Sequence, residues 1–304
     1  MNVFFVSFAD GPVNFKQAGK RIERQAKRFP IFSKVIILDM KTLSNLSEYY
    51  SESMKDLFLL SKYPFFYRAG KAFAINSVLE GFFGECDYLV YADPGCELVS
   101  NFYTRWKLMR MLRKCNLSHA LAESLNLPEW KYTKKSLLDA SGLEENEKFT
   151  SQIQATYSIW KKNELTLNAS RTWCRLSRSY FNYWQDPENI KGELDGFVAH
   201  RQDQSIMSVI WKLNKFGVQK QSRKFSKHFD FFRGSLQPIH TIRNRTGFEV
   251  IPSYYNLNLI AFLAMFPQII VLLLKKFKKI DYKGEPPSGI EPETFALRER
   301  RSTD

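Results

Sequence analysis

The sequence predicts an α/β protein in which a mixed, mainly parallel sheet is flanked by helices. An apolar strand at 3–8, an amphipathic helix at 17–29 and a second apolar strand at 34–39 follow one another with short connections, as in a βαβ unit. A further apolar run at 88–92 is rich in β-forming residues, which suits a parallel strand covered on both faces. Right-handed parallel pairing of these strands is therefore expected.

Two helices are predicted between these strands. The first, at 17–29, has apolar residues at helical spacing with basic residues between them, so one side is expected to be buried and the outer face basic. The second, at 69–83, carries most of its apolar residues on one side and leads into the strand at 88–92. The intervening segment 41–61 is polar and aromatic and shows no firm period.

An acidic residue follows the strand at 88–92. Asp93 is followed directly by Pro94 and Gly95, which turn the chain. Ligands of open α/β sheets bind outside the carboxyl ends of the strands, so Asp93 is placed to meet a ligand or its metal ion. An Asp before Pro-Gly also starts turns through its own side chain. This segment alone does not choose between the two interpretations.

Two more helices are predicted later in the chain. The helix at 102–114 is basic, with an inward face formed by Phe102, Trp106, Met109 and Leu112. The next helix begins near Asp203, within the densely polar run at 200–205, and its apolar residues bury its far side. Asp is a preferred N-cap residue. A cap explains Asp203 alone and not the crowding of polar residues around it, so a functional site is favoured.

The composition and the absence of certain motifs exclude some classes of function but leave several kinds of partner open. The chain has 304 residues, and 45 Lys and Arg against 31 Asp and Glu give a formal charge of +14. This charge suits a polyanionic partner, a phosphorylated substrate or an anionic membrane surface. The motifs of dinucleotide-binding folds, P-loops, zinc proteases and serine hydrolases are absent, which excludes a conventional dehydrogenase, NTPase or hydrolase. The four cysteines show no metal-binding spacing and indicate a reduced, cytoplasmic protein.

Four segments of the chain carry a family resemblance. The segment 87–97 contains Tyr-Ala-Asp-Pro-Gly, and 200–205 reads His-Arg-Gln-Asp-Gln-Ser. These resemble the motifs Y-x-D-A-G and H-R-x-D-Q-S of bacterial glycosyltransferase-like proteins from capsule and cell-surface polysaccharide clusters. Residues 70–73 resemble the W-K-P segment of that family, without its tryptophan, and 152–155 resemble a further shared stretch. The likeness covers roughly residues 1–215. It implies a GT-A type fold, in which a nucleotide sugar lies over the first parallel strands.

The resemblance also implies roles for individual residues. Asp93 takes the place of the DxD-type acid that meets the donor ribose or the metal ion of the donor diphosphate, Mn²⁺ or Mg²⁺. Asp203 would bind the acceptor hydroxyl and act as the general base of an inverting enzyme. The residues implied in substrate binding are Ser7, Phe8, Lys71, Gly95, Arg201 and Gln204. Because only one acid stands where a full DxD has two, His228 or His240 is considered as a further metal ligand, and His240 is chosen, although a single histidine is more often structural.

The composition changes beyond residue 215. Segment 215–245 interleaves basic and aromatic residues, which fits a loop over a diphosphate, contact with anionic lipid, or single-stranded nucleic acid. No RNA-binding or zinc-finger motif supports the last of these. Segment 257–274 is the most hydrophobic and is short for a bilayer span, so it is expected to form a helix that is either monotopic or docked on the domain.

The expected organisation is an α/β domain at 1–250, a hydrophobic and basic segment at 251–280, and a tail at 281–304 that has a disordered composition and resembles a read-through peptide. The expected activity is transfer of a hexosyl group from a nucleotide sugar to a glycan or lipid-linked acceptor in surface polysaccharide synthesis. The enzyme would lie in the cytoplasm, peripheral or monotopic at the inner face of the plasma membrane. The alternative is a catalytically inactive sugar- or nucleotide-binding module of a polysaccharide assembly complex. Nucleic acid is not an expected partner.

Overall fold

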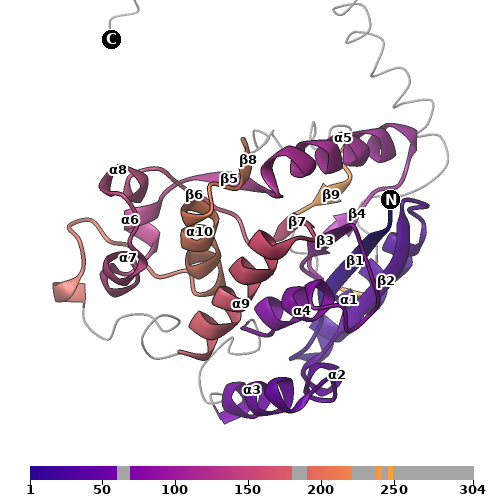
Figure 1. The fold of residues 1–304 in the computed structure, drawn as a ribbon, viewed down its shortest axis with the longest axis horizontal. Coiled ribbons are helices and arrows are strands. Elements are labelled where there is room, and N and C mark those ends of the chain that lie inside the picture. The colour runs from indigo at the N-terminus through magenta and orange to yellow at the C-terminus, as the bar shows by residue number, and fades with distance from the viewer. Residues whose placement is uncertain (60–68, 180–189, 221–236, 242–245, 249–304) are drawn as a thin grey trace, which may run out of the picture. The chain divides into compact units, whose positions relative to one another are not determined.

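The computed structural model describes residues 1–59, 69–179, 190–220, 237–241 and 246–248 (Figure 1). The chain divides into two compact units, Met1–Ala261 and Phe262–Asp304, and every described residue belongs to the first. The predictions made for His228, for segment 251–280 and for the tail at 281–304 lie outside the described residues.

Figure 1 shows the helices and strands of the described chain. The strands are β1 (Val3–Phe8), β2 (Phe32–Leu38), β3 (Tyr88–Ala92), β4 (Glu97–Leu98), β5 (Ala120–Pro128), β6 (Ser151–Ile153), β7 (Tyr157–Lys161), β8 (Gly217–Lys220) and β9 (Ile239–His240). The helices are α1 (Val13–Lys27), α2 (Met40–Ser44), α3 (Glu48–Leu59), α4 (Gly70–Leu79), α5 (Phe102–Ser118), α6 (Glu129–Tyr132), α7 (Lys135–Ser141), α8 (Glu145–Lys148), α9 (Glu164–Arg178) and α10 (Asp203–Leu213), together with a short 3₁₀ helix, η3 (Ile190–Gly192).

A mixed sheet of seven strands forms the centre, in the order β2-β1-β3-β7-β5-β6, with β8 paired to β5. The pairs β1–β2, β1–β3 and β5–β8 are parallel, and β7 pairs antiparallel with both β3 and β5. Within these described strands, only β6 and β7 therefore run against the common direction. The predicted parallel βαβ arrangement is confirmed for the first three strands, and antiparallel pairs extend it.

Helices cover both faces of this sheet. Alternate residues of β1 point to opposite sides, so Val3 and Phe5 pack with α1 and α5, while Phe4 and Val6 pack with α4, α9 and α10. All six residues of β1 are buried for this reason. The double cover explains why the predicted strands are continuous apolar runs rather than alternating ones.

Most predicted elements are found near their expected bounds. The strands at 3–8 and 88–92 match β1 and β3, and the helix predicted at 69–83 corresponds to α4, all of whose residues are buried. Helix α1 begins at Val13, earlier than the pattern predicts. In 41–61, where no period was found, the chain forms α2 and α3, and α2 is capped by the Asp39 carboxylate, which accepts from the Thr42 amide.

The inward face predicted for α5 is wrong for Phe102 and Trp106 and confirmed for Leu112, which is 1% exposed. Phe102 is 70% exposed and Trp106 is 46% exposed, and Met109 is only partly buried. The face that packs on the sheet is formed by Thr104, Leu108, Met111, Leu112 and Cys115. Helix α5 has apolar residues on two sides. The side that packs on the sheet begins at Thr104, which forms a capping box with Asn101.

Two further observations concern compartment and membrane. All four cysteines are buried and none forms a disulfide. Within the ranges that the structure describes, no helix combines the length and the apolar character needed to cross a bilayer.

Candidate functional site

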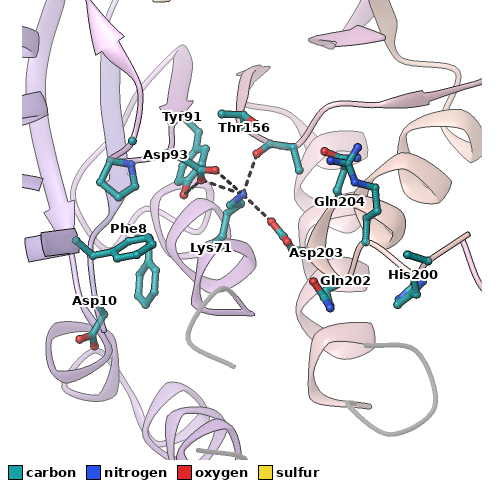
Figure 2. A pocket seen from close by; sticks show the side chains of 16 residues that line it. Phe8, Asp10, Lys71, Tyr91, Asp93, Thr156, His200, Gln202, Asp203 and Gln204 are labelled. Carbon is teal, nitrogen blue, oxygen red and sulfur yellow. Dashed lines mark hydrogen bonds and ion pairs between the residues drawn. The ribbon is translucent and has the colours of Figure 1, made fainter. Parts of the chain in front are cut away.

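A buried lysine joins two carboxylates that are distant in the sequence (Figure 2). The Lys71 ammonium lies 2.9 Å from Oδ1 of Asp93 and 2.7 Å from Oδ2 of Asp203. It also donates a hydrogen bond of 2.9 Å to the carbonyl oxygen of Ala155. The three donors of the ammonium are thus all used, and the Lys71 side chain is only 6% exposed. We call Lys71, Asp93 and Asp203 the Lys71 centre.

Three element ends bring the Lys71 centre together. Asp93 directly follows β3, Lys71 lies in the first turn of α4, and Asp203 is the first residue of α10. The carboxyl end of β3 lies beside that of β1, because the two strands pair in parallel. The centre therefore lies at the sheet edge where α/β proteins bind ligands.

The charges of the centre depend on one another. Burial favours a neutral Lys71, but attraction to Asp203 and Asp93 outweighs it and raises the pKa of the ammonium above its ordinary value. Burial also raises the pKa of Asp93; Lys71 opposes this effect and Asp203 adds to it, so the net change is upward. When both carboxylates are ionised, the centre holds one negative charge in excess.

Tyr91 supports Asp93 through a hydrogen bond. Its hydroxyl donates a hydrogen bond of 2.9 Å to Oδ1 of Asp93. Burial and the nearby carboxylate raise the pKa of Tyr91 well above its ordinary value, so it stays a neutral donor. Its ring also lies under the Lys71 ammonium, 5.6 Å from the centroid.

A cavity of about 380 Å³ opens beside the Lys71 centre. One end is lined by Phe8 and Asp10, and the other by residues at the start of α10, with the centre between them (Figure 2). The full lining is Phe8, Asp10, Phe15, Lys71, Tyr91, Asp93, Pro94, Gly95, Ala155, Thr156, Ala199, His200, Arg201, Gln202, Asp203 and Gln204. The cavity therefore has an aromatic ring and a carboxylate at one end and polar groups at the other.

Two backbone features shape this cavity. A Cβ on Gly70 would lie 2.2 Å from the Phe8 ring, so the start of α4 can approach the end of β1 only without a side chain. Gln202 has φ 42° and ψ −116°, a conformation that residues other than glycine rarely adopt. This turn immediately precedes Asp203. Unusual backbone geometry of this kind is concentrated at functional sites.

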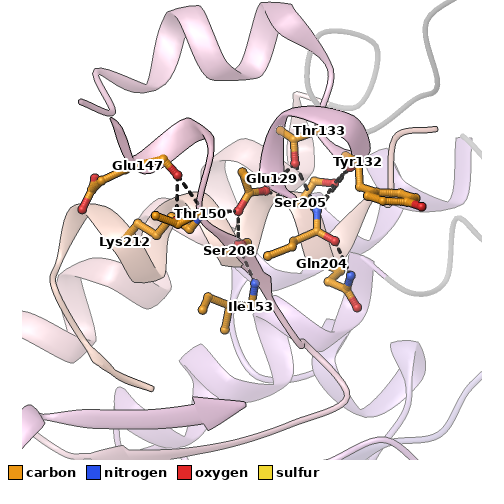
Figure 3. A network of polar contacts seen from close by, with 11 residues as sticks. Glu129, Tyr132, Thr133, Glu147, Thr150, Ile153, Gln204, Ser205, Ser208 and Lys212 are labelled. Carbon is orange, nitrogen blue, oxygen red and sulfur yellow. Dashed lines mark hydrogen bonds and ion pairs between the residues drawn. The ribbon is translucent and has the colours of Figure 1, made fainter. Parts of the chain in front are cut away.

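A second buried polar cluster holds α10 in place (Figure 3). Glu129, at 0% exposure, pairs with Lys212 at 2.7 Å and accepts from Thr133, Gln152 and Ser208. We call these five residues the Glu129 network.

The Glu129 network extends to the cavity wall. The amide of Gln204 donates to Oε1 of Gln152 at 2.5 Å, and the Ser205 hydroxyl donates to the Tyr132 carbonyl at 2.7 Å. The hydrogen bond from Ser208 and the ion pair from Lys212 come from α10 itself, so they fix this helix against α6. The helix held in this way begins at Asp203.

The structure brings together most of the residues implied by the resemblance. Phe8, Lys71, Asp93, Gly95, Arg201, Asp203 and Gln204 all line the cavity. Ser7 does not; it is fully buried, and its hydroxyl has no hydrogen-bond partner among the described residues. His240 also does not line the cavity: it lies in β9, opposite Glu97 of β4, with its Nε2 3.1 Å from the Gln237 carbonyl.

Sequence reasoning missed several cavity residues. Tyr91 was interpreted only as part of a core strand. Asp10 follows β1 as Asp93 follows β3, so the argument from strand ends would have found it. The Ala155 carbonyl that binds Lys71 gives no side-chain signal at all.

The described residues do not fit a divalent metal ion between Asp93 and Asp203. The Lys71 ammonium already lies between these carboxylates, and a doubly charged ion beside it would be repelled. In the described parts of the chain, no three His, Cys, Asp or Glu side chains are grouped so as to hold an ion.

No protein-family model matches the chain, and no curated protein matches it. Among solved structures, the galactosyltransferase LgtC in complex with donor and acceptor sugar analogs gives a TM-score of 0.39 at 12% identity, over 83% of this chain and 85% of that chain. The apo form of mouse xyloside xylosyltransferase 1 gives 0.39 at 10% identity, over 82% of this chain and 95% of that chain. A 4-diphosphocytidyl-2C-methyl-D-erythritol synthase from Anaerococcus prevotii gives 0.33 at 10% identity, over 77% and 94%. These TM-scores are too low to support a function for this chain.

Proposed function

We propose that the protein is a nucleotide-sugar-dependent glycosyltransferase and that the reaction takes place in the cavity beside the Lys71 centre. The observation that carries the proposal is the meeting of Asp93 and Asp203 on one buried lysine at the carboxyl edge of β1 and β3. The resemblance supports it, because the two acids belong to the two most distinctive motifs.

Asp203 is the proposed general base. Its Oδ2 binds Lys71, while its Oδ1 has no hydrogen-bond partner in the described part of the chain and can accept a proton. In an inverting transfer, Asp203 takes the proton of the acceptor hydroxyl as that oxygen bonds to the anomeric carbon. The bond from that carbon to the diphosphate breaks, and the nucleoside diphosphate leaves with the electron pair.

Lys71 and Asp93 adjust the charge around this step. The raised pKa keeps Lys71 protonated, so it holds Asp203 in position and supplies a positive charge in the wall of the cavity from which the diphosphate departs. The excess negative charge of the centre stabilises the positive charge that develops on the sugar ring in an oxocarbenium-like transition state. Arg201 lines the same cavity and adds a cation for the phosphates.

The proposed acceptor is a glycan or lipid-linked saccharide of surface polysaccharide synthesis, and the proposed location is the cytoplasm, at the inner face of the membrane. These parts of the proposal rest on the sequence resemblance. The geometry contributes the polar end of the cavity, where Gln202 and Gln204 offer amide groups to sugar hydroxyls.

Calorimetric titration with a panel of nucleotide sugars tests the proposal. Wild-type protein should bind at least one donor, and Asp93→Asn should weaken that binding about tenfold or more, because a charged hydrogen-bond acceptor is lost. Asp87→Asn, an exposed acid of the same segment, should leave it unchanged. If wild-type protein binds no nucleotide sugar, the proposal is wrong.

One observation favours the alternative of a catalytically inactive binding module. All three donors of Lys71 are used by protein atoms, so none is left for the diphosphate. If the protein is such a module, it should bind the donor without turning it over. The release of nucleoside diphosphate in the presence of an acceptor mixture therefore separates the two functions.

A further inference from the structure

Helix α5 has a second face with large exposed apolar side chains, opposite the face that packs on the sheet. Leu108, Met111 and Cys115 pack on the sheet, whereas Phe102 is 70% exposed, Trp106 46% and Leu117 84%. An exposed stripe that contains a Phe, a Trp and a Leu on one helix is unusual, because large apolar side chains in water are normally scattered singly.

The exposed residues form one continuous stripe. At 3.6 residues per turn, positions 102, 106, 110, 113 and 117 fall within an arc of about 80°. Arg110 and Arg113 lie between Trp106 and Leu117 in this stripe, and both are exposed. The Arg110 guanidinium lies 4.8 Å from the centroid of the Trp106 ring, so the aromatic and basic groups are in contact. We call these five residues the α5 stripe.

The charge of α5 has one sign. The helix contains Arg105, Lys107, Arg110, Arg113 and Lys114 and no acidic residue. Among the described residues, no ion pair joins Arg110, Arg113 or Lys114 to a carboxylate, so these cations remain available.

These features together specify the partner. Transfer of the apolar side chains at both ends of the stripe from water to hydrocarbon is favourable. Trp prefers the interface between hydrocarbon and water, and Arg and Lys neutralise the negative charge of lipid headgroups. Nucleic acid would use the cations and the aromatic rings but would offer nothing to Leu117. An anionic bilayer uses every residue of the stripe.

We propose that the α5 stripe docks the protein on an anionic phospholipid surface, with Phe102, Trp106 and Leu117 inserted at the headgroup level and the basic residues of α5 against the phosphates. The α5 stripe is distant in the sequence from the apolar stretch at 257–274, and the proposal does not depend on the enzymatic activity.

Vesicle flotation of the full-length protein tests this docking. Binding to mixed phosphatidylcholine and phosphatidylglycerol vesicles should be stronger than binding to phosphatidylcholine alone and should weaken with salt. Phe102→Ser with Leu117→Ser, and separately Arg110→Glu with Arg113→Glu, should each lower the partition coefficient about tenfold or more.

Matched controls change similar residues elsewhere on the surface. Val13→Ser with Phe149→Ser removes two exposed apolar side chains, at 71% and 59% exposure, and Lys20→Glu with Lys55→Glu reverses two exposed cations. Both controls should bind as wild type does. Because 257–274 is present in every variant, its contribution is the same in all of them.

Tryptophan quenching by brominated lipids locates the contact. Quenching should occur in wild-type protein and fall sharply in Trp106→Phe, since this substitution removes the only tryptophan of the stripe and keeps an aromatic ring. Stripe variants that bind vesicles as well as the controls do would overturn the proposal. So would quenching that is unchanged in Trp106→Phe, or salt-sensitive binding to RNA with none to vesicles.

Discussion

The Lys71 centre and the Glu129 network both bury a lysine against carboxylate oxygen, but they differ in charge balance and access. In the Glu129 network, one lysine meets one carboxylate, and each oxygen of Glu129 accepts two donors. In the Lys71 centre, one lysine meets two carboxylates, and the Asp93 side chain is still 31% exposed beside a cavity.

The difference separates a structural cluster from a candidate site. A cluster whose charges balance and whose polar atoms are all hydrogen-bonded has no group available to bind a ligand. Substitutions in it are expected to lower the stability of the folded protein. An unbalanced cluster beside a cavity keeps an acceptor for a proton or a hydroxyl group. Substitutions in the two clusters should therefore affect different measurements.

The largest effect is expected from Asp203→Asn. The amide keeps the shape and can still accept from Lys71, but it cannot take a proton, so transfer should fall about a hundredfold to ten-thousandfold. Donor binding and thermal unfolding should change little. The release of nucleoside diphosphate and the melting temperature are the measurements, with the exposed Asp139→Asn as the control. An unchanged rate would remove Asp203 from the reaction.

The corresponding change in the other cluster is Glu129→Gln. It leaves Lys212 buried without an opposite charge, and the free energy of unfolding should fall by about 3–5 kcal/mol. Urea denaturation measures this loss. Adding Lys212→Met should restore part of it, because the stranded charge is then gone. The transfer rate per folded molecule should stay near wild type; a large specific loss would show that the Glu129 network takes part in the reaction.

A smaller loss of stability, but a new pH dependence, is expected for Lys71→Met. Because the folded-state pKa of Lys71 is raised, its stabilisation is complete below the ordinary lysine pKa and is lost as pH rises through the folded value. The substitution should abolish this alkaline loss.

The same substitution should also change how the stability of the protein depends on pH in the acidic range. Without Lys71, the pKa of Asp93, already raised by burial, should rise further, so the variant should be most stable at acidic pH and lose stability as pH increases through that pKa. Melting temperatures across acidic to alkaline buffers test both changes. Parallel curves for variant and wild type would contradict the charge coupling.

The smallest effect is expected from Gly70→Ala. The added methyl would overlap the Phe8 ring and should cost about 1–3 kcal/mol of stability. Donor affinity should also fall, because Phe8 lines the cavity. Gly192→Ala is the matched control, since nothing lies within 4 Å of its added Cβ. Equal behaviour of the two variants would show that Phe8 is free to move aside.

Local patterns predicted the acids of the site for physical reasons. Asp93 follows a continuous apolar run, and Asp203 precedes an amphipathic one, so each marks the end of an element that the sequence specifies by itself. Helix α5 shows the limit of such patterns. Its apolar residues occur on two sides, and the periodicity does not say which side the sheet will bury.

The sequence by itself determined the first strands, the main helices of the α/β arrangement and the two acidic ends, because these depend on residues close together in the chain. Only the tertiary structure decided that Asp93 and Asp203 share Lys71, that Tyr91 and the Ala155 carbonyl complete their contacts, and that Ser7 and His240 lie away from the cavity. Such contacts join residues up to 132 positions apart. They depend on strand order and helix packing, which no local pattern specifies.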